Sequence, residues 1–436
     1  YSLEPLYFLF ALFGEENVEF TYSLLILIRF YLAGITSSIF FLYFKKDYFT
    51  TFIASVVYVF CGFSLFGGTR HAMFMIPMIM FPLLILAIEE IIRNKRWYLC
   101  TIFVAVSLFS NYYYLYMCTI GMGIYFLVRF FCQKDRQKKT FKNFMLKGLT
   151  ISGSYLLGVA MSCIVLVTTF GMYVGSGRSG AAVIKTPSLF YYGADWLVRC
   201  LMSFLTTVNS PGDWLKLGYL PISFLALILL FVKKGRKELK ILTVISVILM
   251  AIPLSGFVFS GFSSISNRWC YMMALLFAYV VAECLPQLRR MDKREILYCA
   301  AGTGIYGFLS FFGNTLTTIY TKAAFVCLAA TLAVVLICHV KNVKWTEAAK
   351  KCLLLALTAA LILFNSHSLF GFSGVILEYT RPGEAQAKGE NTPLRAVEQL
   401  GDESFYRSAT PRLDYSTISS SMLLDYNSIS IFNSTL

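Results

Sequence analysis

The chain has 436 residues, of which 58% are hydrophobic and only 14% are charged, and its formal net charge is +15. Soluble domains carry about 25% charged residues, so this composition excludes an ordinary soluble protein and indicates a polytopic membrane protein. The Lys and Arg residues lie in short loops between apolar runs, which predicts a membrane topology and no nucleic-acid partner.

The first 20 residues are predicted to form an outer interfacial segment. Its apolar part, residues 1–13, is too short to span a bilayer, and an acidic part follows at residues 14–20. About twelve transmembrane helices then fill residues 21–370, which predicts an all-α polytopic membrane protein. The predicted spans are residues 21–43, 50–66, 72–92, 97–114, 116–132, 148–172, 217–232, 241–260, 270–286, 296–313, 322–340 and 352–370.

The orientation of the bundle follows from its loop charges. Six basic loops alternate with loops that hold few charges, and they begin near residues 45, 93, 133, 233, 289 and 341. Because positively charged loops stay in the cytoplasm, the other loops are predicted to be extracytoplasmic. They include a long outer loop at residues 173–216, and loops of that length are usually functional or partly structured.

The composition changes at residue 371, where the chain becomes polar and contains strand-like pieces such as "SISIFNSTL". Residues 371–436 are therefore predicted to start an extracytoplasmic soluble domain that contains β-strands. Since the chain begins without Met and stops within this domain, we expect it to be truncated at both ends.

Two candidate sites for a phosphate lie early in the chain. Arg29 is about two turns inside the first span, where a charged group normally faces a cavity or a partner. Arg70 and His71 end the tight outer loop "GGTRH". A turn that opens a helix beside a cation suits an anionic headgroup, although an interfacial arginine and a capping histidine give the same pattern.

Two aromatic-rich outer segments are candidates for binding a lipid phosphate or a sugar. In "SNYYYLY", Asn111 and Tyr112 are placed to hydrogen-bond a sugar, with an ordinary aromatic belt as the alternative. In "SNRW", Asn267, Arg268 and Trp269 combine a guanidinium that pairs with phosphate and an indole that stacks on a sugar or packs the arginine. A snorkelling arginine beside a belt tryptophan explains that stretch equally well.

The long outer loop supplies three more candidates. Arg178 lies in the glycine-rich "GSGRSG", which lacks the GK[ST] ending of a nucleotide-binding loop. Asp195 and Asp213 are candidates for a catalytic base, with surface solvation as the alternative. No metal site is identified, because the cysteines and histidines are scattered along the apolar runs.

Four stretches, in their order and spacing, resemble the YfhO-like bacterial membrane proteins, which are glycosyltransferases of the GT-C type. They are "FPLLILAIEEIIRNKRWYL" running into "SLFSNYYYLYMCTI" (81–120), "VGSGRSG" (174–180), "SISNRWCYMMALLFAYV" (264–280) and residues 402–436. The resemblance implies a GT-C-like bundle in the bacterial cytoplasmic membrane that acts on the outer side. It implies transfer of a sugar from a polyprenyl-phosphate carrier to a cell-envelope polymer such as teichoic acid.

In GT-C enzymes the catalytic carboxylate lies in the first outer loop, which we expect upstream of Tyr1. Cations at the outer rim would stabilise the phosphate leaving group, and Arg70, Arg178 and Arg268 all lie on that side. No cofactor is identified, and a divalent metal is compatible with this reaction. Two alternatives stay open: a flippase or transporter of a lipid-linked envelope precursor, and a non-catalytic assembly protein that binds cell-wall polymer.

Overall fold

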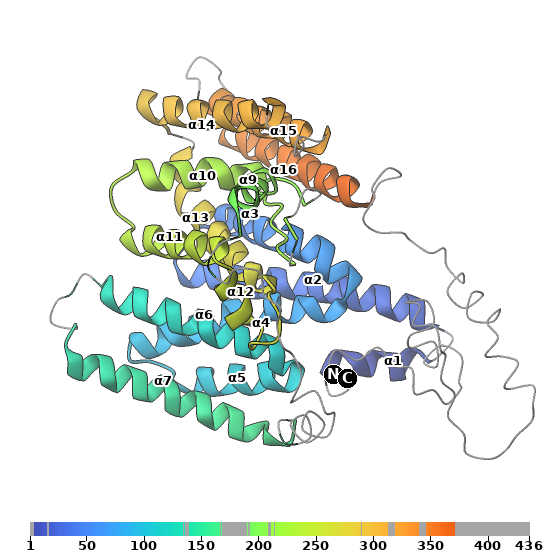
Figure 1. The fold of residues 1–436 in the computed structure, drawn as a ribbon, viewed down its shortest axis with the longest axis vertical. Coiled ribbons are helices and arrows are strands. Elements are labelled where there is room, and N and C mark those ends of the chain that lie inside the picture. Colours follow the sequence, from blue (N-terminus) through green and yellow to red (C-terminus); the bar gives the residue numbers. More distant parts are fainter. Residues whose placement is uncertain are drawn as a thin grey trace, which may run out of the picture. The chain divides into compact units, whose positions relative to one another are not determined.

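The computed structural model describes residues 4–14, 17–133, 135, 139–165, 167, 190, 192–207, 211–212, 214–288, 290–312, 319–339 and 346–370. Every regular element in these ranges is helical, and no β-strand occurs in them (Figure 1). The helices described between residues 5 and 161 and between residues 194 and 370 belong to one of two compact units, the one formed by Tyr1–Val165 and Ile184–Ile376. The domain predicted at 371–436 lies outside the described residues, as do Arg178 and Asp213.

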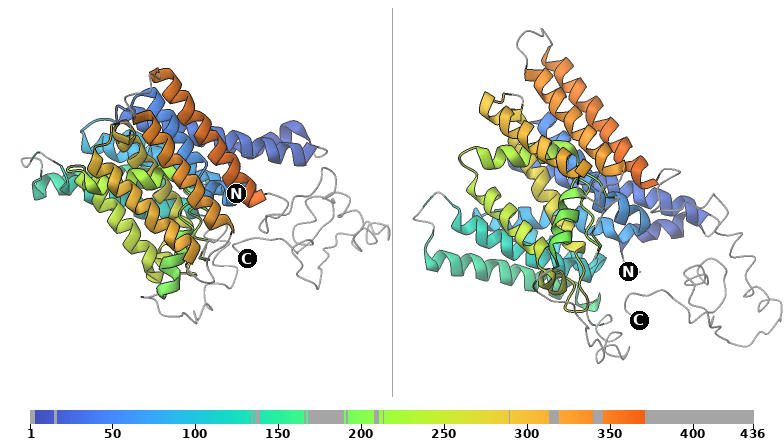
Figure 2. Two further views of the ribbon diagram at one scale, coloured as in Figure 1. Left: turned by 90° about the horizontal axis from the view of Figure 1, so that it is seen from above. Right: turned by 45° about the horizontal axis from the view of Figure 1, so that its top comes forward.

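The long helices of this unit run roughly side by side (Figures 1 and 2). In chain order the elements are η1 (Pro5–Tyr7), α1 (Phe8–Phe13), α2 (Val18–Tyr43), α3 (Tyr48–Val59), the π-helix η3 (Phe63–Gly68), η4 (Ala72–Phe74), α4 (Met75–Ile92), α5 (Tyr98–Ser110), α6 (Tyr112–Phe131), α7 (Phe141–Met161), α9 (Ala194–Met202), α10 (Pro221–Val232), α11 (Lys237–Ala251), α12 (Pro253–Phe259), η7 (Arg268–Cys270), α13 (Tyr271–Leu288), α14 (Lys293–Phe312), α15 (Ile319–His339) and α16 (Glu347–Phe370).

Seven helices in the described part of the chain are long and apolar enough to cross a bilayer. The number is eight if α11 and α12, which are bent by 97° relative to each other, form one broken span. The apolar helices α3, α5 and α10 have 12, 13 and 12 residues, or about 18–20 Å of helix, which is less than the hydrocarbon core. Each predicted span overlaps at least one described helix. The match is partial at 50–66 and 241–260, which each hold two helical elements, and at 148–172, where α7 ends at Met161. The count of about twelve spans stays a prediction.

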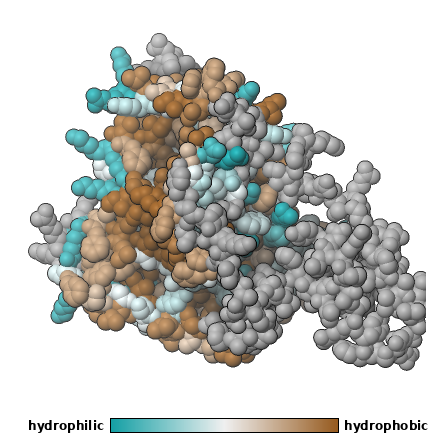
Figure 3. Space-filling model, viewed as in Figure 1, coloured by the Kyte–Doolittle hydropathy of each residue, from teal (hydrophilic) through white to brown (hydrophobic). Residues whose placement is uncertain are grey.

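The exposed surface of the helices is apolar, as expected for contact with lipid. Leu149 and Leu156 on α7 and Ile305, Phe308 and Phe312 on α14 are all more than 60% exposed. Figure 3 shows apolar residues over much of one face, with hydrophilic residues projecting at its edge. The composition of the chain is therefore explained by an apolar exterior as well as an apolar core.

Described residues in or near the basic loops contact one another at one end of the bundle. The contacting pairs are Lys46–Glu283, Arg236–Glu283, Lys147–Asn94, Tyr43–Glu90, Lys233–Glu295 and Lys351–Phe49. The described parts of these loops thus lie together, as the alternation of loop charge along the sequence predicts. We refer to this end as the basic end.

A buried carboxylate organises the basic end. Glu89, at the C-terminal end of α4, is completely buried. One of its oxygens accepts hydrogen bonds from the Arg129 Nε (2.6 Å) and the Tyr125 Oη (2.7 Å) of α6, and the other accepts from the Arg93 Nε (3.1 Å). Two cations and a hydroxyl compensate the buried charge, so this group joins α4 to α6.

The opposite end of the bundle contains irregular backbone between the helices. The chain reverses direction at His71 and again at Asn111, each in an extended conformation, and α11 breaks before Pro253. In a membrane protein, non-helical backbone at depth is tolerated where it is covered by protein or lines a polar cavity. A polar site is therefore expected at this end, away from the basic loops.

Candidate functional site

Arg268 lies at the centre of an aromatic cluster at the non-basic end. The short helix η7 places it directly before α13, and its guanidinium carbon lies 4.7 Å from the Trp214 ring centre, 5.4 Å from that of Phe74 and 5.8 Å from that of Tyr113. These rings hold the guanidinium by cation–π contact. The Arg268 Nε is buried and has no hydrogen-bond partner, so the side chain retains donor capacity for a ligand.

The Arg70–His71 turn lies beside this cluster. The Tyr22 hydroxyl of α2 donates to the Arg70 carbonyl and accepts from the Ala72 N–H, both at 3.3 Å, which fixes the turn. The His71 ring lies 6.2 Å from that of Trp214. Burial, together with the positive charges of Arg70 and Arg268, lowers the pKa of His71 below its ordinary value of 6.5.

Gly67 and Gly68 were expected to make a sharp turn before Arg70, and the structure gives them a different role. Both lie in the π-helix η3, and the reversal occurs at His71. A Cβ atom on Gly67 would lie 2.6 Å from the Phe74 ring, and one on Gly68 would lie 2.5 Å from the Met75 sulfur. The glycines therefore allow η3 to pack closely against the start of the next helix.

A third cation, Lys216, comes from the end of the long outer loop. Its Nζ lies 4.2 Å from the centre of the Phe66 ring, and burial followed by the charge of Arg70 lowers its pKa. The Cys270 thiol contacts the carbonyls of Trp214 and Lys216 at 3.8 and 3.6 Å. The segment that carries Trp214 and Lys216 is thus fastened to the start of α13.

The outer cation cluster, as we call Arg70, Lys216 and Arg268 with His71, brings basic side chains from three segments together. Within the described residues, no carboxylate forms an ion pair with Arg70 or Arg268. Besides burial, the charge of Arg70 lowers the pKa of both His71 and Lys216, so like charges lie near one another here. Such an arrangement favours an anionic ligand.

Arg29 does not belong to this cluster. It is completely buried in α2 and pairs with Glu4 at 2.5 Å, while its guanidinium carbon lies 5.1 Å from the Tyr7 ring centre. The sequence predicts a partner for Arg29, and Glu4 in the N-terminal segment is that partner. Its Nε and one terminal nitrogen remain buried without a hydrogen-bond partner.

Asn111 and Tyr112 lie at the turn between α5 and α6. The Asn111 Oδ1 accepts from the Tyr114 N–H at 3.1 Å and so caps α6, while its Nδ2 is buried without a partner. Tyr112 is half-buried, and its neighbour Tyr113 is the one that contacts Arg268. The segment therefore reaches the outer cation cluster through Tyr113.

Asn267 and Trp269 flank Arg268 but point elsewhere. Trp269 is 2% exposed, stacks on Phe259 at 4.9 Å and donates from its indole nitrogen to the Asn267 Oδ1 at 3.1 Å. The Asn267 amide nitrogen donates to the Tyr192 hydroxyl at 2.9 Å. Both side chains are engaged by protein in packing the outer loop against α12 and α13.

Among the candidate bases, Asp195 is exposed in the first turn of α9, and Asp213 lies outside the described residues. The described residues contain no group of three or more His, Cys, Asp or Glu side chains arranged to hold a metal ion.

The residues that sequence reasoning did not select are Trp214, Lys216 and Tyr113. A signal for Trp214 and Lys216 was present, since a tryptophan and a cation lie in a polar loop directly before an apolar run, as in "SNRW". What the sequence lacks is the contact between that loop and residues 268–270, which only the fold supplies.

Comparison with known proteins places the chain in a family. The model of the family "Bacterial membrane protein YfhO" matches residues 1–436. The "uncharacterized protein YfhO" of Bacillus subtilis (strain 168) is 24% identical over 271 residues, which are 61% of this chain and 29% of that protein. The matched region thus spans less than a third of the relative's length, and no solved structure is similar to the chain. The chain belongs to the YfhO family of bacterial membrane proteins.

Proposed function

We propose that the chain forms the membrane part of a glycosyltransferase that moves a sugar from a polyprenyl-phosphate carrier to a cell-envelope polymer such as teichoic acid. The observation that carries the proposal is the outer cation cluster, in which Arg70 and Arg268 have no described carboxylate partner. It lies at the end of α4 and α13 opposite the basic loops, the side that the positive-inside rule assigns to the exterior.

The chemistry explains why cations are needed there. The acceptor hydroxyl attacks the anomeric carbon of the sugar, and the bond between that carbon and the carrier phosphate breaks. The phosphate oxygen keeps the electron pair, while the hydroxyl proton passes to a general base. Preorganised donors such as the Arg268 guanidinium stabilise the negative charge that develops on the leaving phosphate.

The aromatic rings make this stabilisation more effective. Trp214, Phe74 and Tyr113 fix the guanidinium of Arg268 and exclude water from its buried Nε. In a water-poor site, a fixed cation interacts more strongly with a phosphate than it does in solvent. The cluster is therefore suited to stabilising a leaving group as well as to attracting an anion.

The test uses a strain that lacks the full-length protein. Its cell-envelope polymer is analysed for a missing sugar substituent, and the strain is complemented with wild type or with Arg268→Ala. We expect the substituent to be lost in the deletion, restored by wild type and absent with Arg268→Ala at normal membrane levels. An unchanged polymer in the deletion strain would contradict the transferase proposal.

The broken span formed by α11 and α12 is the feature that favours the alternative of a flippase, because transporters use discontinuous helices. An assay of purified protein in liposomes distinguishes the transferase from the flippase. Movement of a lipid-linked sugar across the bilayer without glycosyl transfer to an added acceptor would favour the flippase.

A further inference from the structure

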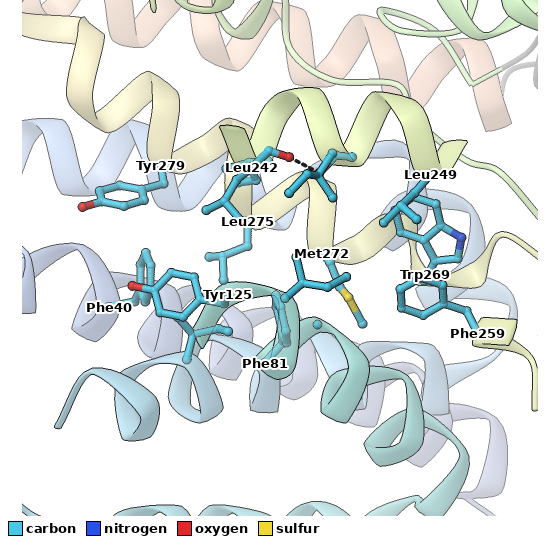
Figure 4. Close-up of a pocket in the computed structure, with 16 residues that line it drawn as sticks. Phe40, Phe81, Tyr125, Leu242, Leu249, Phe259, Trp269, Met272, Leu275 and Tyr279 are labelled. Carbon is cyan, nitrogen blue, oxygen red and sulfur yellow. Dashed lines mark hydrogen bonds between the residues drawn. The ribbon is translucent and has the colours of Figure 1, made fainter. Parts of the chain in front are cut away.

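An apolar groove lies between α6 and α11, and residues of α4 and α13 complete its walls (Figure 4). Its volume is about 90 Å³, whereas one water occupies about 10–15 Å³ on that scale. The lining side chains are apolar or aromatic except for Ser246, whose hydroxyl donates to the Leu242 carbonyl at 2.8 Å. Water in such a groove would lack partners, so hydrocarbon is the favoured occupant.

The two ends of the groove differ. Figure 4 shows Trp269 and Phe259 at one end and Tyr125 and Tyr279 at the other. The Tyr125 hydroxyl donates to the buried Glu89, so that end is closed by the network of the basic end. Trp269 directly follows Arg268 in η7, so the other end adjoins the outer cation cluster.

The position of the groove in the bundle gives it access to lipid. On α11, Leu242, Ile245 and Leu249 line the groove, while the neighbouring Val244 and Ile248 are 46% and 51% exposed on the surface of the helix. One edge of the groove is therefore formed by a helix that faces the membrane interior. A chain can enter sideways from the bilayer while its headgroup stays at the membrane surface.

The small volume of the groove, about 90 Å³, favours one chain over two. Gly121 on α6 lets the facing Met272 and Phe81 side chains approach that helix closely, because an added Cβ would lie 2.6 Å from the Met272 sulfur and 3.1 Å from the Phe81 ring. Met272 is flexible and adapts to an irregular occupant such as a methyl-branched prenyl chain. A diacyl lipid would bring two chains to this groove.

We infer that this groove holds the part of the carrier's polyprenyl chain nearest to the phosphate, with the phosphate at Arg268. The inference rests on the proposed function, since that function supplies the carrier. Beyond that function, it identifies the groove as the surface that distinguishes a prenyl carrier from the abundant diacyl phospholipids.

The test uses a polyprenyl phosphate without a sugar that carries a diazirine on its first isoprene units. The full-length protein is reconstituted in nanodiscs, illuminated and digested, and the labelled peptides are identified by mass spectrometry. We expect labelling of α6 and α13 near Gly121 and Met272, competed by unlabelled polyprenyl phosphate and not by a diacyl phosphatidic acid.

Two pairs of variants make the test specific. Gly121→Leu and Ser246→Phe each fill the groove, from opposite walls. Gly123→Leu, where nothing lies within 4 Å of an added Cβ, and Val247→Phe, where the side chain is 45% exposed, place the same bulk on the outer surface of the same helices. Ser246→Phe serves if Gly121→Leu does not assemble, because it disturbs no buried glycine.

We expect each groove-filling variant to lower the labelling at least about fivefold and each control to leave it unchanged. Unchanged labelling in both groove variants, or equal competition by phosphatidic acid, would overturn the inference. Specific labelling in a protein that transfers no sugar would instead contradict the proposed function and leave the groove assignment standing. Sugar transfer that persists in both groove variants would instead contradict the groove assignment and leave the proposed function standing.

Discussion

Arg268 and Trp214 face each other with 4.7 Å between the guanidinium carbon and the indole ring centre, although they come from different segments of the chain. The contact fixes a cation that has no described carboxylate partner and brings the end of the long outer loop to the start of α13.

Replacing Arg268 by alanine should abolish most sugar transfer. Removing one preorganised donor from a developing anion lowers the rate by about 100-fold or more. Arg268→Lys should recover part of the activity, since it keeps the charge and loses the planar fork. Rates are measured with purified protein, a polyprenyl-phosphate sugar and an acceptor polymer.

The control for this experiment is Arg199→Ala. Arg199 is an exposed arginine of α9 that contacts none of the rings around Arg268. Equal loss of activity in the two variants would mean that general outer-surface charge, and not the fixed guanidinium, supports transfer.

The folded protein should lose stability as the pH falls through the range in which His71 protonates. The pKa of His71 is lowered from 6.5 by burial, Arg70 and Arg268, so below pH 6.5 the unfolded chain binds a proton that the folded chain resists. The free energy of unfolding therefore decreases from about pH 6.5 downward until the folded pKa is passed. The measurement is the melting temperature of detergent-solubilised protein across that range, compared with His71→Gln.

The pH experiment is repeated with added inorganic phosphate. An anion at the outer cation cluster compensates the extra charge on His71, so added phosphate should reduce the loss of stability at low pH in wild type. A loss of the same size in His71→Gln would assign the effect to another group.

Glu89→Gln should destabilise the bundle by about 1.5–3 kcal/mol. The substitution removes the charge that pairs with Arg93 and Arg129, whose side chains are 35% and 27% exposed, and a hydrogen bond to a charged group contributes about this much. Glu347→Gln provides the contrast, because Glu347 is 67% exposed beside Lys350 and surface pairs contribute at most about 1 kcal/mol. Denaturant titrations in detergent compare the two, and similar values would contradict the structural role of Glu89.

Gly62→Ala should loosen the segment that carries Trp214 and Lys216. The Gly62 N–H donates to the Leu217 carbonyl at 2.8 Å, and an added Cβ would lie 2.6 Å from that oxygen. Overpacking of this kind typically costs about 1–3 kcal/mol, and sugar transfer should fall with it. Gly153→Ala on α7 is the matched control, since nothing lies within 4 Å of its Cβ, and alanine there should be neutral or slightly stabilising.

The sequence predicts the helices well because an apolar run in a membrane has few alternatives to helix. Long runs such as Val18–Tyr43 appear as single helices, and residues in or near three of the basic loops, Lys46, Arg236 and Glu283, meet at one end. The sequence predicts less well whether a span is one continuous helix. The break between α11 and α12 depends on how Ile252 and Pro253 pack in the bundle, which hydropathy does not record.

For the site, too, the sequence predicts the residue types better than their contacts in the folded chain. Arg70 and Arg268 were selected and lie in one cluster, whereas Arg29 pairs with Glu4 elsewhere. In "SNRW" the residue types indicate a binding site. They do not show which of the three successive side chains faces the cluster, because a short helix points them in different directions. Trp214 and Lys216 were not selected because their relation to Arg268 exists only after the chain has folded.

The Lys46–Glu283 pair has a consequence for how the protein is made. The two residues are 237 positions apart, and translation proceeds at about 5–20 residues per second. The loop after α2 therefore waits on the order of 10–50 s for its counter-ion to emerge from the ribosome. During that interval the hairpin of α2 and α3 resides in the bilayer without α13, the helix against which it finally packs, so membrane insertion and tertiary assembly of this region are separate events in time.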